Sequence, residues 1–237
     1  FGKIGNSRLD YAGGKNPSPA YYQNLPSYSL SDPDGPDYEQ AFIDQQEFVT
    51  NGQINWEGTH GILNANQNTN TLGLPAAYVL YEDRNDDKQL SINSIFNTEL
   101  NENIMINAAV TYKNLKSENF GEIIDLLGGN GYLDADSFAE DFNEKQNNLL
   151  NPLNIVGEGE KFKYNFNLNS NVVDAFVQGQ FKYNKIDFYA AANVSRTAHQ
   201  REGLFQNGGF ANSSLGKSEK LSFTNFGAKG GLTYKLT

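Results

Sequence analysis

The sequence predicts an all-β fold in which antiparallel strands are joined by alternating short turns and long polar loops. Apolar and polar residues alternate with period two over several stretches of the second half, which is typical of strands with two different faces. The apolar content relies on 16 Phe and 13 Tyr, and 23 Gly residues favour turns. These observations predict a β-rich chain with many turns.

Composition excludes several classes of function. The 237 residues include 28 acidic and 18 basic side chains, and this net charge of −10 argues against a nucleic-acid surface. There is no cysteine and there are only two histidines, His60 and His199, so neither a thiolate metal site nor a three-histidine zinc site can form. No stretch approaches the roughly 20 apolar residues of a transmembrane helix, but alternation keeps hydropathy low in membrane strands as well.

The first strand hairpin is expected over residues 77–117. One strand starts near Ala77, with a bulge over residues 82–87, and a short turn follows at residues 101–103. The returning strand should turn Asn107 to its polar face. Its apolar face contains Ile104, Ile106, Ala108 and Val110.

A second hairpin is expected over residues 161–196, and a last strand over residues 219–237. Asn184-Lys185 is a two-residue turn signal. The apolar positions change from even to odd numbers along the first strand of this hairpin, which predicts a bulge near residues 169–171. The apolar faces of these strands include Val177, Phe181, Phe188, Ala190, Ala192, Leu232 and Tyr234.

Long loops are expected over residues 6–76, 118–160 and 197–218, and they should contain short helices. Pro36 and the apolar spacing after it predict one helix, and a second is expected near residues 137–142. Short turns at one end and long loops at the other are typical of a transmembrane antiparallel β-barrel. The alternative is a soluble β-sandwich, although its core should contain more Leu, Ile and Val.

A series of short motifs runs in order along nearly the whole chain and resembles a known family. The motifs lie at residues 2–9 (GKIGNSRL), 21–28 (YYQNLPSY), 78–81, 86–88, 114–117, 125–129, 200–204, 216–221, 225–227 and 229–234. They are similar to the central barrel region of Oar-like TonB-dependent receptors of Bacteroidetes, which carry an N-terminal carboxypeptidase-regulatory-like domain.

The resemblance implies an energised importer of the bacterial outer membrane with extracellular loops. Such receptors have a plugged 22-stranded barrel, and the TonB complex pulls on the plug to admit a bound substrate. This sequence contains no plug and about six strands, so we expect it to be a piece of a longer polypeptide. The implied partners are outer-membrane lipid, the TonB complex through the missing N-terminal region, a surface lipoprotein and the remainder of the same barrel, but no nucleic acid.

Candidate site residues follow from this interpretation. Lipid would contact the apolar faces, while Asn93, Asn107, Asp187 and Asn193 would face the lumen and the plug. The substrate vestibule would include Tyr21, Tyr22, Tyr28, Trp56 and Arg201, although the aromatic residues could equally form a small core of their own loop. Calcium is the one candidate cofactor, with Asp32, Asp34 and Asp37 as ligands, and a solvated turn is the alternative.

The sequence offers no catalytic residues, and we do not expect an enzyme. The G-x-S-x-G motif is absent, and the glycine-rich run at residues 128–131 lacks the Lys-Ser/Thr pair of a phosphate loop. The expected function is binding and energised import of an unidentified substrate. Two alternatives stay open: a soluble cell-surface β-sandwich for binding or adhesion, and a receptor-like structural subunit of a secretion or gliding assembly.

Overall fold

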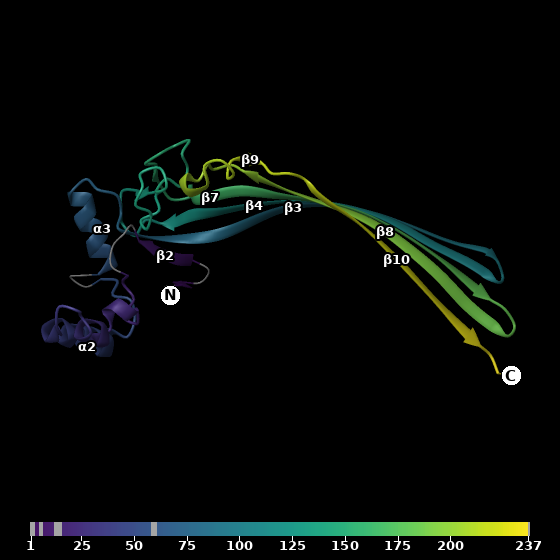
Figure 1. The fold of residues 1–237 in the computed structure, drawn as a ribbon, viewed down its shortest axis with the longest axis horizontal. Helices are drawn as coiled ribbons and strands as arrows, with labels where there is room; N and C mark the ends of the chain where they lie inside the picture. The colour runs from purple at the N-terminus through teal and green to yellow at the C-terminus, as the bar shows by residue number, and fades with distance from the viewer. Residues whose placement is uncertain (1–2, 5–6, 12–15, 58–60, 237) are drawn as a thin grey trace. The chain divides into compact units, whose positions relative to one another are not determined.

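The structure is a computed structural model that describes residues 3–4, 7–11, 16–57 and 61–236 (Figure 1). The chain forms two compact units, which we describe separately. The first unit contains Phe1–Arg84, Phe120–Asn165 and Phe205–Ser214, and the second contains Asn85–Asn119, Phe166–Leu204 and Leu215–Thr237.

Most of the strand residues belong to one sheet, and the predicted all-β, mainly antiparallel class is confirmed. Its strands are β1 (Lys3–Ile4), β2 (Ser7–Tyr11), β3 (Tyr78–Asn101), β4 (Ile104–Asp125), β7 (Lys161–Lys182), β8 (Ile186–Gly203) and β10 (Leu221–Tyr234), in that order, with β9 (Gly216–Lys217) paired to β8. A second sheet pairs β5 (Tyr132–Leu133) with β6 (Ile155–Val156).

Both predicted tight turns are confirmed. β3 ends at Asn101 and β4 begins at Ile104. In the second hairpin, Tyr183 N donates to Ile186 O at 3.0 Å, which leaves Asn184 and Lys185 as the two turn residues. The connections at the other ends of these strands are long, as predicted from the alternation of short turns and long loops along the sequence.

The strands extend further than the sequence predicted. β4 continues to Asp125 and β8 to Gly203, beyond the expected boundaries at residues 117 and 196. Residues 7–11, which we assigned to the long loop over residues 6–76, instead form β2 and pair with β3. Short polar-rich segments give a weak alternation signal, and pairing with a neighbouring strand decides their conformation.

Neither predicted bulge interrupts its strand. Residues 82–87 lie within the single strand β3. β7 pairs with β8 in one unbroken register from Phe166↔Gly203 to Lys182↔Asp187, through residues 169–171. The change of parity therefore marks a change in which face of β7 carries the apolar side chains.

The predicted helix after Pro36 is confirmed as α2 (Tyr38–Asn51). Asp37 caps it, since its carboxylate accepts a hydrogen bond from Gln40 N at 2.9 Å, and Gly52 ends it in the left-handed conformation at φ 49°. The helix expected at residues 137–142 is wrong; Asp136 instead accepts from Phe138 N in a turn that competes with a helix.

Four further helices are short, and all belong to the first unit. They are η1 (Tyr22–Asn24), α1 (Pro26–Leu30), α3 (Ile62–Thr71) and η2 (Gly208–Phe210). Among the described residues, no helix combines the length and apolar character needed to cross a membrane.

The first unit has a conventional buried core made of two clusters. One contains Ala76, Val79, Tyr81, Ile123, Tyr132, Val156 and Phe162, and the other contains Ile62, Leu80 and Leu127 with Leu9, Ile54, Trp56 and Tyr78 packed against it. Residues that the sequence assigned to separate loops thus fold together around one end of β3 and β4.

One buried side chain joins the helices of this unit to its strands. Asn66 of α3 is fully buried. Its Nδ2 donates to Tyr78 O at 2.8 Å, Leu126 O at 2.9 Å and Leu127 O at 3.2 Å. Its Oδ1 accepts from Ala77 N at 2.9 Å and Tyr78 N at 3.0 Å. A single amide therefore satisfies backbone groups at the start of β3 and after the end of β4.

The next turn of α3 repeats this arrangement. Asn70 Nδ2 donates to Gly128 O at 2.6 Å, and Asn70 Oδ1 accepts from Asn130 N at 2.9 Å. Between them, a Cβ on Gly129 would lie 2.4 Å from the Cβ of Ala76, so only glycine fits there. The glycine-rich run is thus a structural loop clamped by a helix.

We predict that Asn66→Ala lowers the free energy of unfolding of the first unit by about 3 kcal/mol or more, because each buried group left unpaired costs about 1–3 kcal/mol. Trp56, the single tryptophan, lies in this unit, so its fluorescence in urea measures the change. Gln67→Ala, at an exposed position of the same helix, is the control and should be nearly neutral. Equal, small losses in both variants would contradict the role given to Asn66.

Candidate functional site: the two-faced sheet of the second unit

The register of β7, β8 and β10 gives the second unit two chemically different faces. Directly paired residues of an antiparallel sheet lie on the same face, so each row across the three strands can be assigned. We call one face the apolar band. Its rows are Ala175 with Val194 and Phe226, Val177 with Ala192 and Ala228, Gly179 with Ala190 and Gly230, Phe181 with Phe188 and Leu232, and Ile186 with Tyr234.

These five rows, all within the described residues, contain no charged side chain. They cover eight residue steps from Ile186 to Val194, which is about 27 Å along the strand. Arg196 lies in the next row. A charge-free stretch of this length on one face is unusual for a sheet in contact with water.

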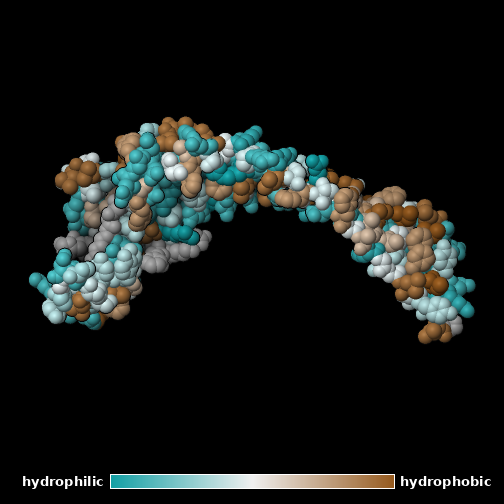
Figure 2. Space-filling view, in the orientation of Figure 1, coloured by the Kyte–Doolittle hydropathy of each residue, from teal (hydrophilic) through white to brown (hydrophobic). Residues whose placement is uncertain are grey.

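The apolar band is exposed. Phe226 is 81% exposed, Leu232 70% and Tyr234 54%. Figure 2 shows hydrophobic residues gathered toward the end of the sheet at which β8 begins and β10 ends. Proteins in water rarely expose so continuous an apolar surface. We therefore expect apolar groups of another molecule or segment to contact the band.

Aromatic rings gather at the tight turn of the second hairpin. The rings of Phe181 and Phe188 stack with centroids 4.5 Å apart, and Tyr183 lies 6.4 Å from Phe188. Tyr234 is in the last row of the band, next to Ile186. The aromatic residues therefore mark one edge of the band.

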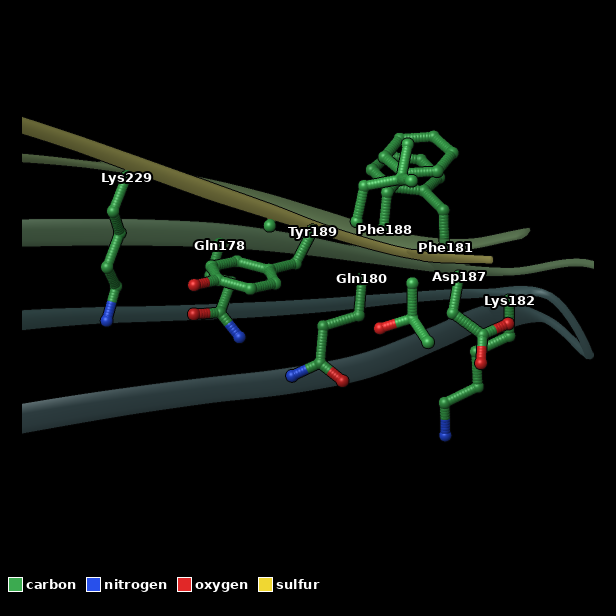
Figure 3. A pocket seen from close by; sticks show the side chains of 11 residues that line it. Gln178, Gln180, Phe181, Lys182, Asp187, Phe188, Tyr189 and Lys229 are labelled. Atoms are coloured by element: carbon green, nitrogen blue, oxygen red, sulfur yellow. The ribbon is translucent and has the colours of Figure 1, made fainter. Parts of the chain in front are cut away.

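The opposite face of the same strands is polar. Figure 3 shows Gln178, Gln180 and Lys182 on the other side of the strands from the stacked rings of Phe181 and Phe188. The polar side chains border a depression of about 470 Å³. Asp187, also on this face, forms an ion pair with Lys235 at 2.8 Å.

The predicted apolar residues thus share one face wherever the register is given. This holds for Val177, Phe181, Phe188, Ala190, Ala192, Leu232 and Tyr234. On β4, Ile104, Ile106, Ala108 and Val110 occupy alternate positions and so share a face, and Val110 is 52% exposed. Asp187 and Asn193 lie on the polar face, as predicted for lumen-facing residues.

The predicted vestibule residues divide into three groups. Tyr22 lies between Tyr21 and Tyr28, with ring centroids at 4.7 Å and 5.6 Å, and the cluster is partly exposed. Tyr21 also lines a cavity of about 290 Å³ with Leu9, Tyr11, Asn16, Pro17, Ser18 and Ile54. Trp56 instead packs into the core of the first unit, which was the alternative for it.

Arg201 belongs to the second unit, where its guanidinium lies 4.9 Å from the ring centre of Phe166. His199 is an exposed residue of β8, and His60 lies outside the described residues. His199 and Arg201 both take part in the pairing of β8 with β7.

The structure does not gather the three predicted calcium ligands. The Asp32 carboxylate accepts from Asp34 N at 2.9 Å, and the Asp37 carboxylate caps α2. Within the described residues, no group of three or more His, Cys, Asp or Glu side chains could hold a metal ion. The Asp32 and Asp37 carboxylates thus accept hydrogen bonds from backbone groups close to them in the chain.

A buried polar cluster in the first unit was missed by the sequence analysis. Asp134 is 3% exposed, and its Oδ1 accepts from Lys163 N and Asn147 Nδ2, both at 2.8 Å. Lys163 forms an ion pair with Asp10 at 2.6 Å, and its Nζ lies 4.0 Å from the ring centre of Tyr81. Lys163 has a left-handed backbone conformation at φ 63°. No sequence motif around Lys163 predicts this conformation.

Burial shifts the ionisation of this cluster. Desolvation raises the pKa of the Asp134 carboxyl, although the hydrogen bonds from Lys163 N and Asn147 and the charge of Lys163 oppose the shift. Burial, followed by the nearby Asp10 carboxylate, raises the pKa of the Tyr132 hydroxyl. The cluster connects β2, β5 and β7 by charge and hydrogen bonds, and it is a structural feature of the first unit.

Comparison of the chain with protein-family models and with curated proteins gives no match. The function therefore has to be argued from the geometry above.

We predict that Asp134→Asn makes the stability of the first unit less dependent on pH. Because the folded-state pKa of Asp134 is raised, its stabilising contribution is complete below the unfolded pKa and is lost as pH rises through the folded pKa. Asparagine keeps the accepting Oδ1 without a desolvated charge, so the variant should be at least as stable as the parent at pH 7.

Asp134→Ala is the matched variant. It leaves Lys163 N and Asn147 Nδ2 unpaired, so we expect a loss of about 1–3 kcal/mol at pH 4 and at pH 7. Urea unfolding followed by Trp56 fluorescence measures both variants at both pH values. If asparagine were as damaging as alanine at each pH, the assignment of the Asp134 hydrogen bonds would be wrong.

Proposed function

We propose that this chain is part of the transmembrane β-barrel of a bacterial outer-membrane TonB-dependent receptor of the Oar-like kind, which binds and imports an unidentified substrate. The observation that carries the proposal is the apolar band: a charge-free, solvent-exposed face built from aromatic and small residues. In this proposal, lipid chains cover the band, and the polar face lines the lumen.

The dimensions of the band support this proposal. Barrel strands tilt by about 35–45°, so about 27 Å along the strand corresponds to about 20 Å across the membrane, close to the roughly 25 Å apolar band of outer-membrane barrels. Ala190, Ala192 and Gly230 suit lipid because acyl chains fill the space beside small side chains, whereas a protein core would leave cavities there. The aromatic residues at the tight turn fit the girdle at a membrane interface.

The strand order supports a larger barrel. β10 stands at one end of the order, so its outer backbone groups need pairing partners if the sheet lies in lipid. In our proposal, the remaining strands of the same barrel supply these partners. Energy for import comes through the TonB complex and a plug outside this chain.

The first unit contributes the external binding region in this proposal. Its core contains residues of the long connections 6–76 and 118–160, which in this proposal are extracellular loops. The cluster of Tyr21, Tyr22 and Tyr28 presents partly exposed rings beside a cavity, and such rings stack on sugars or peptides. The work of the protein is binding followed by passage, with no covalent step.

We predict that Ala190→Arg or Ala192→Arg blocks assembly into lipid vesicles, because an arginine facing the middle of a membrane costs about 2–4 kcal/mol. The control is Asn193→Arg, on the polar face and next to Ala192, which should assemble normally. Assembly of the full-length protein is measured by the shift between boiled and unboiled samples on a denaturing gel.

The variants also separate a membrane barrel from a soluble sandwich. In a sandwich, Ala190→Arg would disrupt an internal core, and the protein would misfold in detergent-free buffer and in detergent alike. Assembly of both alanine variants as efficiently as the control would refute a lipid-facing band.

A further inference from the structure

Helix α2 of the first unit exposes large apolar side chains and buries a carboxylate, the reverse of an ordinary surface helix. Ala41 and Asp44 form its buried face, at 6% and 3% exposed. Its large apolar side chains face solvent: Tyr38 is 74% exposed, Phe42 65% and Val49 69%. A surface helix usually buries its apolar stripe and exposes its carboxylates.

The orientation is fixed by contacts with α1. The Asp44 carboxylate accepts from Ser29 Oγ and from Gln40 Nε2, both at 2.8 Å. Ser29 O also accepts from Asp37 N at 3.0 Å, at the start of α2. Turning the helix to hide its aromatic residues would break this buried network, so the exposed stripe is a stable feature.

The exposed residues form one continuous stripe. Tyr38, Phe42 and Val49 are separated by four and seven positions, which places them on the same side of a helix. We call these three residues the α2 stripe. Peptide-binding helices and grooves use this spacing for their apolar anchors.

The surroundings of the α2 stripe are acidic. Asp32, Asp34 and Asp37, just before α2, and Glu39 in its first turn are exposed. In the sequence, no Lys or Arg occurs between Lys15 and Arg84. A partner that covers the stripe is therefore favoured if it brings positive charge, whereas an anionic lipid surface would be repelled.

We propose that the α2 stripe is a docking surface for a cationic amphipathic helix of a partner protein. The partner's apolar side chains would cover Tyr38, Phe42 and Val49, and its Lys or Arg residues would face Glu39 and the acidic residues just before the helix. Burial of the stripe provides affinity, while the rim charges mainly set the association rate and its salt dependence. The inference uses the first unit alone and does not depend on the proposed membrane function.

The test uses the full-length protein in a non-ionic detergent and three synthetic 18-residue peptides, with binding measured by biolayer interferometry. One peptide is an amphipathic helix of Leu and Lys, the second has Glu in place of Lys, and the third is a scrambled Leu-Lys sequence. We expect the first peptide to bind at least tenfold more tightly than the other two. Equal binding of all three would overturn the proposal.

Variants locate the binding surface. Phe42→Gln with Val49→Gln changes only exposed positions and should weaken the Leu-Lys peptide at least tenfold, with unchanged Trp56 fluorescence as the check on folding. Glu39→Gln with Asp34→Asn should slow association and reduce its salt dependence. Phe138→Gln, at a position that is 83% exposed and outside α2, is the control. If the Phe42/Val49 variant bound as tightly as this control, the stripe would not be the docking surface.

Discussion

The amide of Asn66 is the interaction on which the first unit depends. Backbone groups at the start of β3 and after β4 are partly or fully buried, and the Asn66 side chain pairs with them. Buried N–H and C=O groups need partners, and here a side chain from α3 supplies three donations and accepts twice. With these hydrogen bonds formed, Ile62, Leu80 and Leu127 pack together as a buried cluster.

The two units solve the problem of burial in different ways. The first unit brings its apolar side chains together inside, and the buried Asp134 carboxylate accepts two hydrogen bonds beside them. The second unit is a sheet with one apolar and one polar face, and its apolar residues Phe226, Leu232 and Tyr234 are exposed. This contrast explains why one chain combines ordinary core residues such as Ile123 with exposed residues such as Phe226.

The sequence predicted those parts of the fold that have local causes. Alternation located β3, β4, β7, β8 and β10, and the residue pair Asn184-Lys185 located a turn, because strands and tight turns are governed by residues close in the chain. Asn66 and the pair of Asp10 and Lys163 were missed because their partners lie far away in sequence and have no motif. The spacing in α2 predicted a helix, but not that Asp44 would face inward and Phe42 outward, since packing against α1 decides the orientation.

The hydrogen bonds of Asn66 also affect the order in which the first unit folds. Its partner at Leu127 lies 61 residues further along the chain, so the closing contact forms only after β4 has been synthesised. Loop closure over such a separation costs entropy before any contact forms, and this slows folding. Until then α3 can contact only the start of β3, and Ile62 and Leu80 lack Leu127 as the third residue of their core.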